Sequence, residues 1–592
     1  MMPITATRLL RLQPILVITL IACIPALFSG YLGDDYIHYA LLSPDIAIPT
    51  ANDWSLFGLF SWIDAEPARN KVLMDLGVIP WWTDEGMRYQ FWRPVSEISH
   101  WIDHQLWRGF PAMMHLHSLL WYLGLGYLVF RLFRQMGMSA QPALIGLAVF
   151  MLDATHGLTI SWIANRNALI AAVFGVLAIQ QYVRWRETEA PRHFVASLSL
   201  LIASLFSGEI GISTSCYLGA YALILDRKGP WKGLLALWPF AVTCILWWTL
   251  YKLGNFGANN SDLNYIDPVE SPLIFLSKLF ERIPVLLFAQ LGIIPAEIYG
   301  FSPKPVPAYL ALAWLFIAGV VYLLWPLLRA SAAARFWALG ALFSVAPVTA
   351  TVPADRNLLF VGIGASALLG MLFHALFCKL QTSRLQRGGT WVLVVLHLIL
   401  SPLLLPVFSY SPQLWSQLMT LPLARDIPIE SPQESLITFG IPMPIGLGAT
   451  PMRFAEGLPL PDKFWMISSL QQDFMITRID ANTLRITAPD GMINAIEANL
   501  RNLERNPITT DFRIRLTDLD IAVSKVMPDG KPRELTLTFH NNRLENTRIL
   551  TWNGMQFERH AIPLNHGEAL ALALNTRTDN AGQLMAASGA EQ

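Results

Sequence analysis

Residues 308–328 read AYLALAWLFIAGVVYLLWPLL, a run of 21 residues without a charged side chain. A helix needs about 20 apolar residues to cross the ~30 Å hydrocarbon core of a bilayer, so this run predicts a transmembrane helix. Ten further apolar runs lie within residues 1–410. The sequence therefore predicts a mainly α membrane protein, a bundle of about eleven transmembrane helices. The expected spans are 13–31, 112–130, 140–157, 167–183, 193–207, 210–225, 233–251, 308–328, 335–352, 357–378 and 391–409.

Composition agrees with this fold class and divides the chain. Hydrophobic residues make up 54% of the 592 residues and charged residues 14%, whereas about a quarter of the residues in soluble domains are charged. The deficit of charge lies in residues 1–410, and residues 411–592 have the composition of a soluble protein. A net charge of zero gives no sign of a nucleic-acid partner.

The orientation of the spans follows from the basic residues in the short loops, which collect on the cytoplasmic side. They occupy the segment before the first span and every second connection after it. With the N-terminus cytoplasmic and an odd number of spans, the domain after residue 410 is predicted to be extracytoplasmic, and the protein to be multi-pass in the plasma (inner) membrane. The residues are Arg8, Arg11, Arg131, Arg134, Arg184, Arg186, Arg192, Arg227, Lys228, Lys232, Arg329, Arg335, Lys379, Arg384 and Arg387.

Two segments leave alternatives open. Residues 273–298 are apolar enough for a span, but Lys278, Glu281 and Arg282 interrupt them and Pro284 removes a helix hydrogen bond. We interpret this segment as a re-entrant or interfacial helix on the outer face, with a twelfth span as the alternative. The first apolar run resembles a signal peptide, but no small-x-small cleavage site closes it, so we expect it to remain as a span.

The longest loop between spans is residues 32–111, predicted on the outer face. Loops of this length are usually functional. Seven tryptophans run through it, and because indole rings favour the headgroup level, the loop is expected to lie on the membrane surface. These are Trp54, Trp62, Trp81, Trp82, Trp92, Trp101 and Trp107.

The loop begins with two adjacent carboxylates, Asp34 and Asp35. Adjacent carboxylates at a membrane boundary repel one another and are costly to desolvate, so one pKa can rise while the other group stays ionised. Such a pair suits a general base. The alternative is a solvated loop start that only ends the span.

Further polar residues, most of them ionisable, lie at the same ends of later spans. Ionisable groups at membrane boundaries that face one side suggest a common pocket, although helix ends are often polar for no functional reason. They are Asp153, His156, Asn165 and Arg166, then Glu209 in SGEIG, and then Asp355, Arg356 and Asn357 in PADRNLLF.

Five motifs together resemble the GT-C glycosyltransferases, which include protein O-mannosyltransferases, the aminoarabinose transferase of lipid A and tetratricopeptide-bearing mannosyltransferases. They occur in family order over residues 1–380. Two departures are that no basic residue adjoins Glu209 and that His156 stands alone in its motif. The motifs are GDDYIHY, FWRPVSEISHWIDHQLWRGFPAMMHLHSLLWY, ATHGLTISWIANRNALIAAVFGVLAIQQY, LFSGEIGIS and PADRNLLF.

The resemblance implies transfer of a sugar from a polyprenyl-phosphate donor to an envelope glycan, lipid or protein acceptor at the outer face. By position, Asp34 matches the catalytic base and Asp35 its neighbour. Arg166 and Arg356 are the candidates for binding the donor phosphate. The substrate-orienting candidates are Asp153, His156 and Glu209. No cofactor is assigned, because a divalent metal is required by some members of this superfamily and not by others.

A second reading of the outer loop concerns metal binding. Glu97, His100, Asp103 and His104 have the spacing of metal ligands on a helix, with the two histidines at i and i+4. The simpler interpretation is an amphipathic helix whose polar face meets water. The four cysteines lie in or beside apolar runs and form no zinc motif.

The C-terminal part is predicted to be a small antiparallel sheet, possibly a sandwich with one helix. Residues 411–465 are rich in Pro and Gly and are interpreted as a linker, and residues 466–592 as the strand-rich domain. FMITRI, TLRITA and RELTLTF alternate apolar and polar residues. RILTWNGMQFER contains an Asn-Gly hairpin signal. The helix is expected near MINAIEANLRNLE.

The alternative function is a transporter or flippase of polyprenyl-linked glycans. Transporters are expected to carry ionisable residues near the middle of their spans. Here the middles of the spans are almost free of charge, which favours the enzyme.

Overall fold

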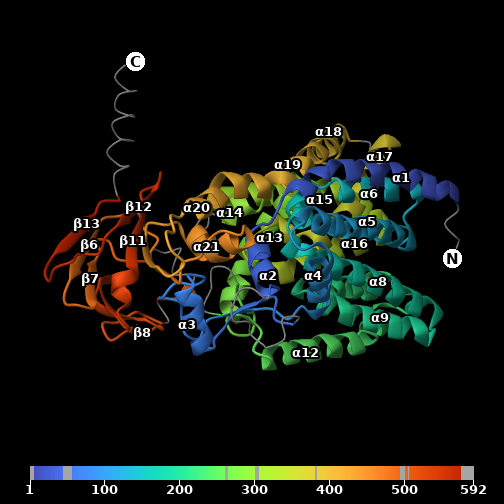
Figure 1. Cartoon of the computed structure of the whole chain (residues 1–592). Coiled ribbons are helices and arrows are strands. Elements are labelled where there is room, and N and C mark those ends of the chain that lie inside the picture. Colours follow the sequence, from blue (N-terminus) through green and yellow to red (C-terminus); the bar gives the residue numbers. More distant parts are fainter. Residues whose placement is uncertain are drawn as a thin grey trace, which may run out of the picture. The chain divides into compact units, whose positions relative to one another are not determined.

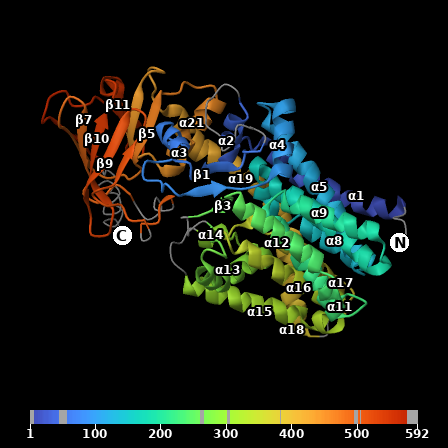
Figure 2. The same ribbon diagram turned by 90° about the horizontal axis from the view of Figure 1, so that it is seen from below.

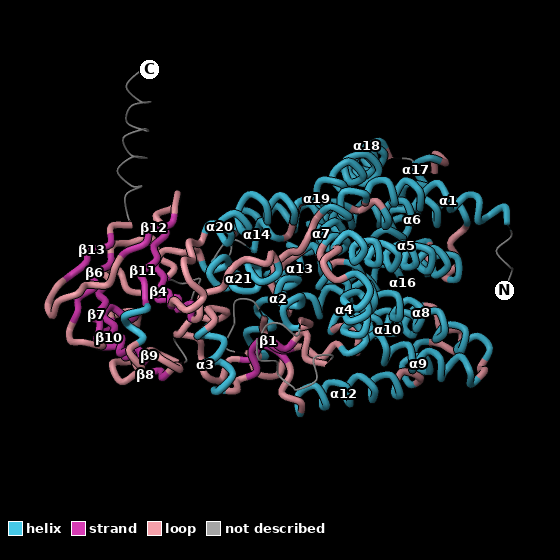
Figure 3. The backbone as a smooth tube through the Cα atoms, in the orientation of Figure 1, coloured by secondary structure: helices cyan, strands magenta, loops and turns pink. Residues whose placement is uncertain are grey.

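The computed structural model describes residues 6–43, 57–259, 265–300, 306–380, 383–493, 500–503 and 506–574. The chain forms two compact units. The helical unit comprises Met1–Asp35, Phe91–Gly257 and Asn264–Trp415, and the sheet unit comprises Tyr36–Gln90, Ala258–Leu263 and Ser416–Gln592. Figure 1 follows the chain through both by colour, and Figure 3 separates the cyan helices from the magenta strands.

The helical unit is built from long apolar helices joined by short turns. Short 3-10 helices, labelled η, interrupt the chain where the polar motifs lie. The elements are α1 (Ala6–Ala22), η1 (Ile24–Phe28), α4 (Pro94–Trp107), α5 (Pro111–Gln135), α6 (Ala140–Met151), η2 (Ala154–His156), α7 (Gly157–Ser161), η3 (Ile163–Asn165), α8 (Arg166–Thr188), α9 (Pro191–Leu205), η4 (Glu209–Ile212), α10 (Ser213–Ile224), α11 (Pro230–Leu235), α12 (Trp238–Leu253), α13 (Pro272–Gly292), α14 (Glu297–Gly300), α15 (Pro307–Ala330), α16 (Ala332–Val348), η5 (Asp355–Asn357), α17 (Leu359–Phe377), α18 (Arg384–Val395), the π-helical turn η6 (Leu396–Leu400) and α19 (Ser401–Trp415).

The expected mainly helical membrane protein is confirmed, and each of the eleven expected spans falls on helix. The number eleven is not confirmed. Among the described residues, six helices are long and apolar enough to cross a membrane, or seven if α6 and the bent helix after it form one span. Three more apolar helices are shorter. The six are Pro111–Gln135, Ile163–Thr188, Pro230–Leu253, Pro307–Ala330, Leu359–Phe377 and Arg384–Asp426, and the shorter ones are Leu12–Phe28, Pro191–Leu205 and Ala332–Val348.

Helix α17 lies inside the bundle and packs closely on α6. Nearly all of its side chains are buried. At Gly370, a Cβ atom would come within 2.5 Å of the Pro142 carbonyl oxygen. Small residues of this kind let membrane helices approach closely.

Most of the segment 273–298, left open above, forms helix α13 (Pro272–Gly292), and its last two residues begin α14. Pro284 lies inside this helix and does not end it. Its side chain is buried together with Arg282, whose guanidinium donates to the carbonyls of Thr349 and Thr351. The helix is not among the candidate spans of the described residues.

The sheet unit contains two main sheets. The six-stranded sheet has the order β13-β6-β7-β10-β9-β8 and is antiparallel, whereas the four-stranded sheet, β12-β11-β4-β5, has parallel pairs on both sides of β4. Figure 2 shows β7, β10 and β9 of the larger sheet side by side. The strands are β4 (Ser435–Phe439), β5 (Lys463–Ser468), β6 (Phe474–Arg478), β7 (Thr483–Thr487), β8 (Arg513–Arg515), β9 (Leu519–Val526), β10 (Pro532–Phe539), β11 (Thr547–Trp552), β12 (Phe557–His560) and β13 (Ala569–Leu572).

The hairpins β6–β7 and β11–β12 lie where the sequence predicts them, and β10 covers RELTLTF. The helix expected near residues 492–504 falls largely on residues outside the described ranges.

Residues 411–465, predicted as a linker, contain ordered elements. These are the C-terminal part of α19, the π-helical turn η7 (Ser416–Thr420), α20 (Leu421–Asp426), the buried central strand β4 and α21 (Met443–Ala455). Prolines stand in the first turns of α20 and α21, where the missing N–H costs no helical hydrogen bond. Prolines in this segment therefore mark two of its helix starts.

The middle of the outer loop belongs to the sheet unit. It forms α2 (Asp34–Leu41), which begins in the helical unit, then β1 (Ser61–Asp64), α3 (Pro67–Asp75) and β2 (Arg88–Gln90). The indole N–H of Trp465 donates to Asp75 over 2.7 Å, and Trp81 donates to the Ile467 carbonyl over 3.1 Å. Trp81 and Trp82 are buried. The expected placement on the membrane surface is therefore wrong for these tryptophans, because they pack in the core of the sheet unit.

Candidate functional site

Asp34 and Asp35 begin helix α2, directly after Gly33, whose φ of +49° lies in the left-handed region. The Asp35 carboxylate is buried and accepts hydrogen bonds from the amides of Leu32, over 3.0 Å, and Ala164, over 2.7 Å. Asp34 is only half-buried, and among the described residues no donor is hydrogen-bonded to its carboxylate. One carboxylate is thus fixed by the backbone while its neighbour is left accessible.

Burial raises the pKa of Asp34 to about 6, against the opposing positive charges of Arg356 and Arg93. Burial also raises the pKa of Asp35, to about 8, and the charge of Asp34 adds to this while the amides of Leu32 and Ala164 oppose it. The two adjacent carboxyl groups therefore differ, and the pKa of Asp34 is the lower of the two.

Arg356 lies in η5, and its guanidinium carbon is 4.5 Å from the centre of the Trp162 ring. The side chain is half-exposed, and no carboxylate of the described residues forms an ion pair with it. The carboxylate of Asp355 next to it accepts from the Ala296 amide over 2.8 Å, and the Asp355 amide donates to Glu297 over 2.9 Å. These hydrogen bonds hold the loop that carries Arg356. The Arg356 guanidinium stacks on the Trp162 indole and keeps N–H donors that can bind a ligand.

Glu209 stands at the start of η4 and forms an ion pair with Arg93. The Arg93 Nε and a terminal nitrogen lie 2.8 and 2.6 Å from one Glu209 oxygen, and the Tyr251 hydroxyl lies 3.1 Å from the other. Arg93 occupies the N-cap position of α4, where its side chain makes no capping hydrogen bond. The positive charge of Arg93 also opposes the rise in the pKa of Asp34.

Arg93 is the residue that the sequence analysis missed. The resemblance places a basic residue next to the acid in the motif of Glu209, and this chain has none at that position. The structure supplies the positive charge from residue 93, 116 positions earlier. The available signal was the Arg-Pro pair of FWRP. A proline often stands at the first position of a helix, so the arginine before it is placed at the start of that helix.

Asp153 and His156 do not join this site. Asp153 accepts from the amide and hydroxyl of Thr155 and from the Gln290 side chain, over 2.7 to 3.0 Å. The Nδ1 atom of His156 is 2.9 Å from the Tyr122 hydroxyl. Both side chains are buried. They hold η2 against α5 and α13, so a direct contact with substrate is not supported.

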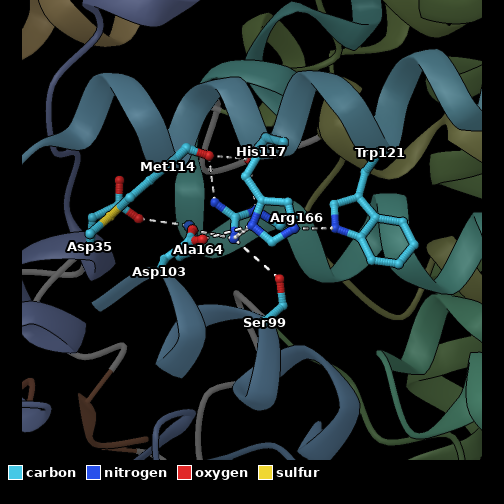
Figure 4. A network of polar contacts seen from close by, with 9 residues as sticks. Asp35, Ser99, Asp103, Met114, His117, Trp121, Ala164 and Arg166 are labelled. Carbon is cyan, nitrogen blue, oxygen red and sulfur yellow. Dashed lines mark hydrogen bonds and ion pairs between the residues drawn. The ribbon is translucent and has the colours of Figure 1, made fainter. Parts of the chain in front are cut away.

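Arg166 also lies away from the open part of the site. Its side chain is fully buried and forms an ion pair with Asp103, as Figure 4 shows. The remaining guanidinium donors reach Ser118, Ser99 and the Met114 carbonyl. With its donors engaged inside the protein, Arg166 is not placed to bind a phosphate, which corrects the role that the resemblance implies for it.

The metal-ligand spacing on α4 has a different explanation. Glu97, His100, Asp103 and His104 are all buried, so they are not a water-facing surface either. Within the described part of the chain, no three His, Cys, Asp or Glu side chains are grouped so that they could hold a metal ion. The opposite face of α4 exposes Ile98, Trp101, Ile102 and Leu106. The helix is amphipathic with its polar face inward.

An apolar groove of about 650 Å³ lies between η1 and α19. The Ser29 hydroxyl donates to the Ser409 carbonyl over 2.8 Å and ties the two elements together. Phe28, at the end of η1, precedes Asp34 by six positions in the sequence. Its lining residues are Ile24, Pro25, Phe28, Pro406, Val407, Tyr410 and Leu414.

The chain was compared with known proteins. No family model matches it, and no curated protein does. Solved structures do. The chain is similar to the oligosaccharyltransferase of Archaeoglobus fulgidus, solved with a tethered acceptor peptide, at a TM-score of 0.36 and 13% identity over 76% of this chain and 64% of the other. The chain thus spans 64% of the length of that protein.

A second similar protein is ArnT from Cupriavidus metallidurans. The structure bound to undecaprenyl phosphate gives a TM-score of 0.37 and 13% identity, covering 90% of this chain and 98% of ArnT. The apo structure gives 0.34 and 14%, covering 67% and 79%. At such identities and TM-scores, the roles of this chain's residues follow from its own geometry alone.

Proposed function

We propose that this protein is a membrane glycosyltransferase that moves a sugar from a polyprenyl-phosphate donor to an acceptor at the extracytoplasmic face. The observation that carries the proposal is the arrangement around Asp34: a half-buried carboxylate without a hydrogen-bond donor among the described residues, in the field of two guanidinium groups. A carboxylate without a hydrogen-bond donor can take up a proton from a substrate. Guanidinium groups near it can stabilise negative charge that develops on a leaving group.

Asp34 is the general base of the proposed reaction. Its carboxylate accepts the proton of an acceptor hydroxyl or amine while the acceptor oxygen or nitrogen attacks the anomeric carbon of the sugar. Burial raises the pKa of Asp34 to about 6, close to neutrality, where a base is both ionised and able to bind a proton. Asp35 holds the start of α2 through its two backbone amide contacts.

Arg356 is the proposed partner of the leaving group. When the bond between the anomeric carbon and the phosphate oxygen breaks, the phosphate gains negative charge. A planar guanidinium can hold two phosphate oxygens at once, and a donor fixed in advance stabilises charge that develops in the transition state. Arg93, held by Glu209, adds a second positive charge beside the base.

The apolar groove between η1 and α19 suits the hydrocarbon part of such a donor. Helix α7, which packs on α19, leads into Trp162, the residue on which Arg356 stacks. At Gly157 in α7, a Cβ atom would lie 2.7 Å from the Phe408 Cβ, so these elements are in close contact. An isoprenoid chain in the groove would thus lie close to the proposed phosphate site.

The acceptor is proposed to be a glycan, lipid or protein of the cell envelope, and membrane lipids surround the helical unit. The proposed reacting groups stand at the starts of helices or in the turns before them, not in the middle of a span. This favours an enzyme over a transporter or flippase, in which ionisable residues are expected near mid-span.

The direct test is a transfer assay with the full chain in lipid nanodiscs. Polyprenyl-phosphate donors carrying different radiolabelled sugars are supplied, and label in envelope acceptors is measured. Transfer from one of them supports the proposal and names the sugar. In parallel, the protein in sealed vesicles is tested for movement of the same lipids between leaflets; lipid movement without transfer would assign it to the transporter class. Mass spectrometry of envelope glycans from a deletion strain identifies the acceptor.

A further inference from the structure

A buried ion pair joins helices α4 and α8. The Arg166 guanidinium contacts the Asp103 carboxylate, and both side chains are 0% exposed (Figure 4). Arg166 is the first residue of α8, and Asp103 lies in the last half of α4. A buried charge that loses its partner is strongly unfavourable, so each residue constrains the position of the other.

The same guanidinium is also fixed to α5. Its Nε donates to the Ser118 hydroxyl over 2.8 Å, and a terminal nitrogen donates to the Met114 carbonyl over 2.6 Å. The first turn of α8 is therefore held to two helices by one side chain. A rotation of the first turn of α8 about the helix axis would break at least some of these contacts.

His117 completes the set of contacts on Asp103. The Trp121 indole, which can only donate, lies 3.0 Å from the His117 Nε2 atom. Nε2 must therefore accept, and the proton of the neutral ring lies on Nδ1, which is 2.7 Å from the Asp103 carboxylate. Asp103 thus accepts from both Arg166 and His117, which fixes the orientation of its carboxylate.

The acidic pair depends on the same turn. Ala164, two residues before Arg166, donates its amide hydrogen to the Asp35 carboxylate over 2.7 Å. Asp35 in turn is adjacent to Asp34. A shift of the α8 start would withdraw this amide and release the beginning of α2.

We propose that Asp103 and Arg166 are positioning residues, which hold the Ala164 amide against Asp35 and so fix the reactive orientation of Asp34. This inference rests on the proposed function for the role of Asp34, but its structural part does not. Neither residue of the pair touches substrate.

Helix α8 itself offers a matched control at its other end. Arg186 pairs with Asp226 there, with Nε and Oδ2 2.7 Å apart and side-chain exposures of 8% and 1%. The control pair has the same chemistry and similar burial, but it lies in the last turn of α8, 20 residues from Arg166. Damage caused by general destabilisation should appear in both pairs.

The experiment compares Arg166→Met with Arg186→Met in the full chain. Because a lone buried carboxylate can prevent folding, Arg166→Met/Asp103→Leu is included, since an apolar pair of similar volume is often tolerated. Two readouts are taken: sugar transfer as a function of pH, and labelling of Asp35 by a hydrophobic carbodiimide, followed by mass spectrometry. Labelling of the exposed Asp473 in the sheet unit serves as the internal reference.

We expect the double variant to fold, to label Asp35 at least about tenfold faster than wild type, and to transfer sugar about 10²-fold more slowly, the loss typical of a reacting group displaced by about 1 Å. Its pH profile should shift, and that of Arg186→Met should not. Unchanged Asp35 labelling in the folded double variant would overturn the inference. Faster labelling with normal transfer would keep the positioning of Asp35 but remove Asp34 from the proposed reaction.

Discussion

Two polar regions of the helical unit look alike in the sequence and differ in the structure. The first contains Asp34, Arg356 and the Arg93–Glu209 pair, and the second contains Asp153, His156 and Arg166. In the first region the Asp34 carboxylate and the Arg356 guanidinium are half-exposed, and neither has an ion-pair partner among the residues that the structure describes. In the second region the side chains are buried, and Asp153, Arg166 and the Nδ1 atom of His156 are held by defined hydrogen bonds.

The difference separates polar residues at span ends that stabilise the fold from those that can bind a substrate. Buried polar groups must find partners inside the protein, and residues that have found them serve the fold. A group held in place but left with unused hydrogen-bonding capacity can serve a substrate. The comparison therefore predicts loss of transfer from changes in the first region and loss of stability from changes at Asp153 and His156 in the second.

The largest effect is expected for Asp34→Asn. The substitution is nearly isosteric and removes the base, so transfer should fall by about 10² to 10⁴, the usual contribution of a positioned general base. Single-turnover transfer measures this, with donor binding measured in parallel and expected to persist. Asp473→Asn, an exposed site in the sheet unit, is the control. A larger loss from Asp35→Asn would reverse the two roles.

A smaller loss is expected for Arg356→Lys. The substitution keeps the charge but loses the planar pair of donors and the stacking on Trp162. Transfer should therefore fall by about 10- to 100-fold, less than the about 10²- to 10³-fold lost when a transition-state donor is removed outright. Protein level and thermal stability should stay near wild type. Arg335→Lys at an exposed helix start is the control. Wild-type transfer in Arg356→Lys would mean that another group holds the donor phosphate.

The pH dependence of transfer tests the state of the base. Because burial raises the pKa of Asp34 to about 6, the active ionised form is lost as the pH falls through that value. Transfer should therefore decline below pH 6 with a slope of one, by about tenfold at pH 5. The rates are measured at fixed ionic strength, and residual transfer by Asp34→Asn should lack this step. A profile that is flat from pH 5 to pH 7 would contradict the assignment of Asp34.

The smallest effect on transfer is expected for Asp153→Asn. The amide group would face the Gln290 donor and leave buried groups without partners, at a cost of about 1–3 kcal/mol in the free energy of unfolding. Transfer per folded molecule should remain within about twofold of wild type. Thermal unfolding in detergent and transfer in nanodiscs are compared. Normal stability with lost transfer would return Asp153 to the substrate site.

Several parts of the architecture were readable from local patterns. Long apolar runs predict helices because unpaired backbone N–H and C=O groups in a bilayer cost a large free energy, which a helix avoids. All eleven expected spans fall on helix. The hairpin at Asn553-Gly554 follows from turn chemistry that needs only a few residues. The motif containing Asp34 was recognisable for the same reason, since it is contiguous in the chain.

The failures share one cause. Residues 57–90 pack with the sheet unit because Asp75 and Trp81 find partners more than 380 positions away, and no local composition encodes such a contact. Prolines at helix starts and prolines in a linker cannot be told apart in the sequence. Residues 411–465 were therefore predicted as a linker although they contain helices and a strand.

By itself, the sequence determined that the chain is a helical membrane protein with a strand-rich part, and it located the acidic pair and Arg356. Only the tertiary structure decided that Arg166, Asp153 and His156 are internal and that Arg93 replaces the missing basic neighbour of Glu209. The physical reason is that the burial of a side chain and its hydrogen-bond or ion-pair partners depend on how distant parts of the chain pack together. The same arginine binds a substrate or an aspartate according to what surrounds it.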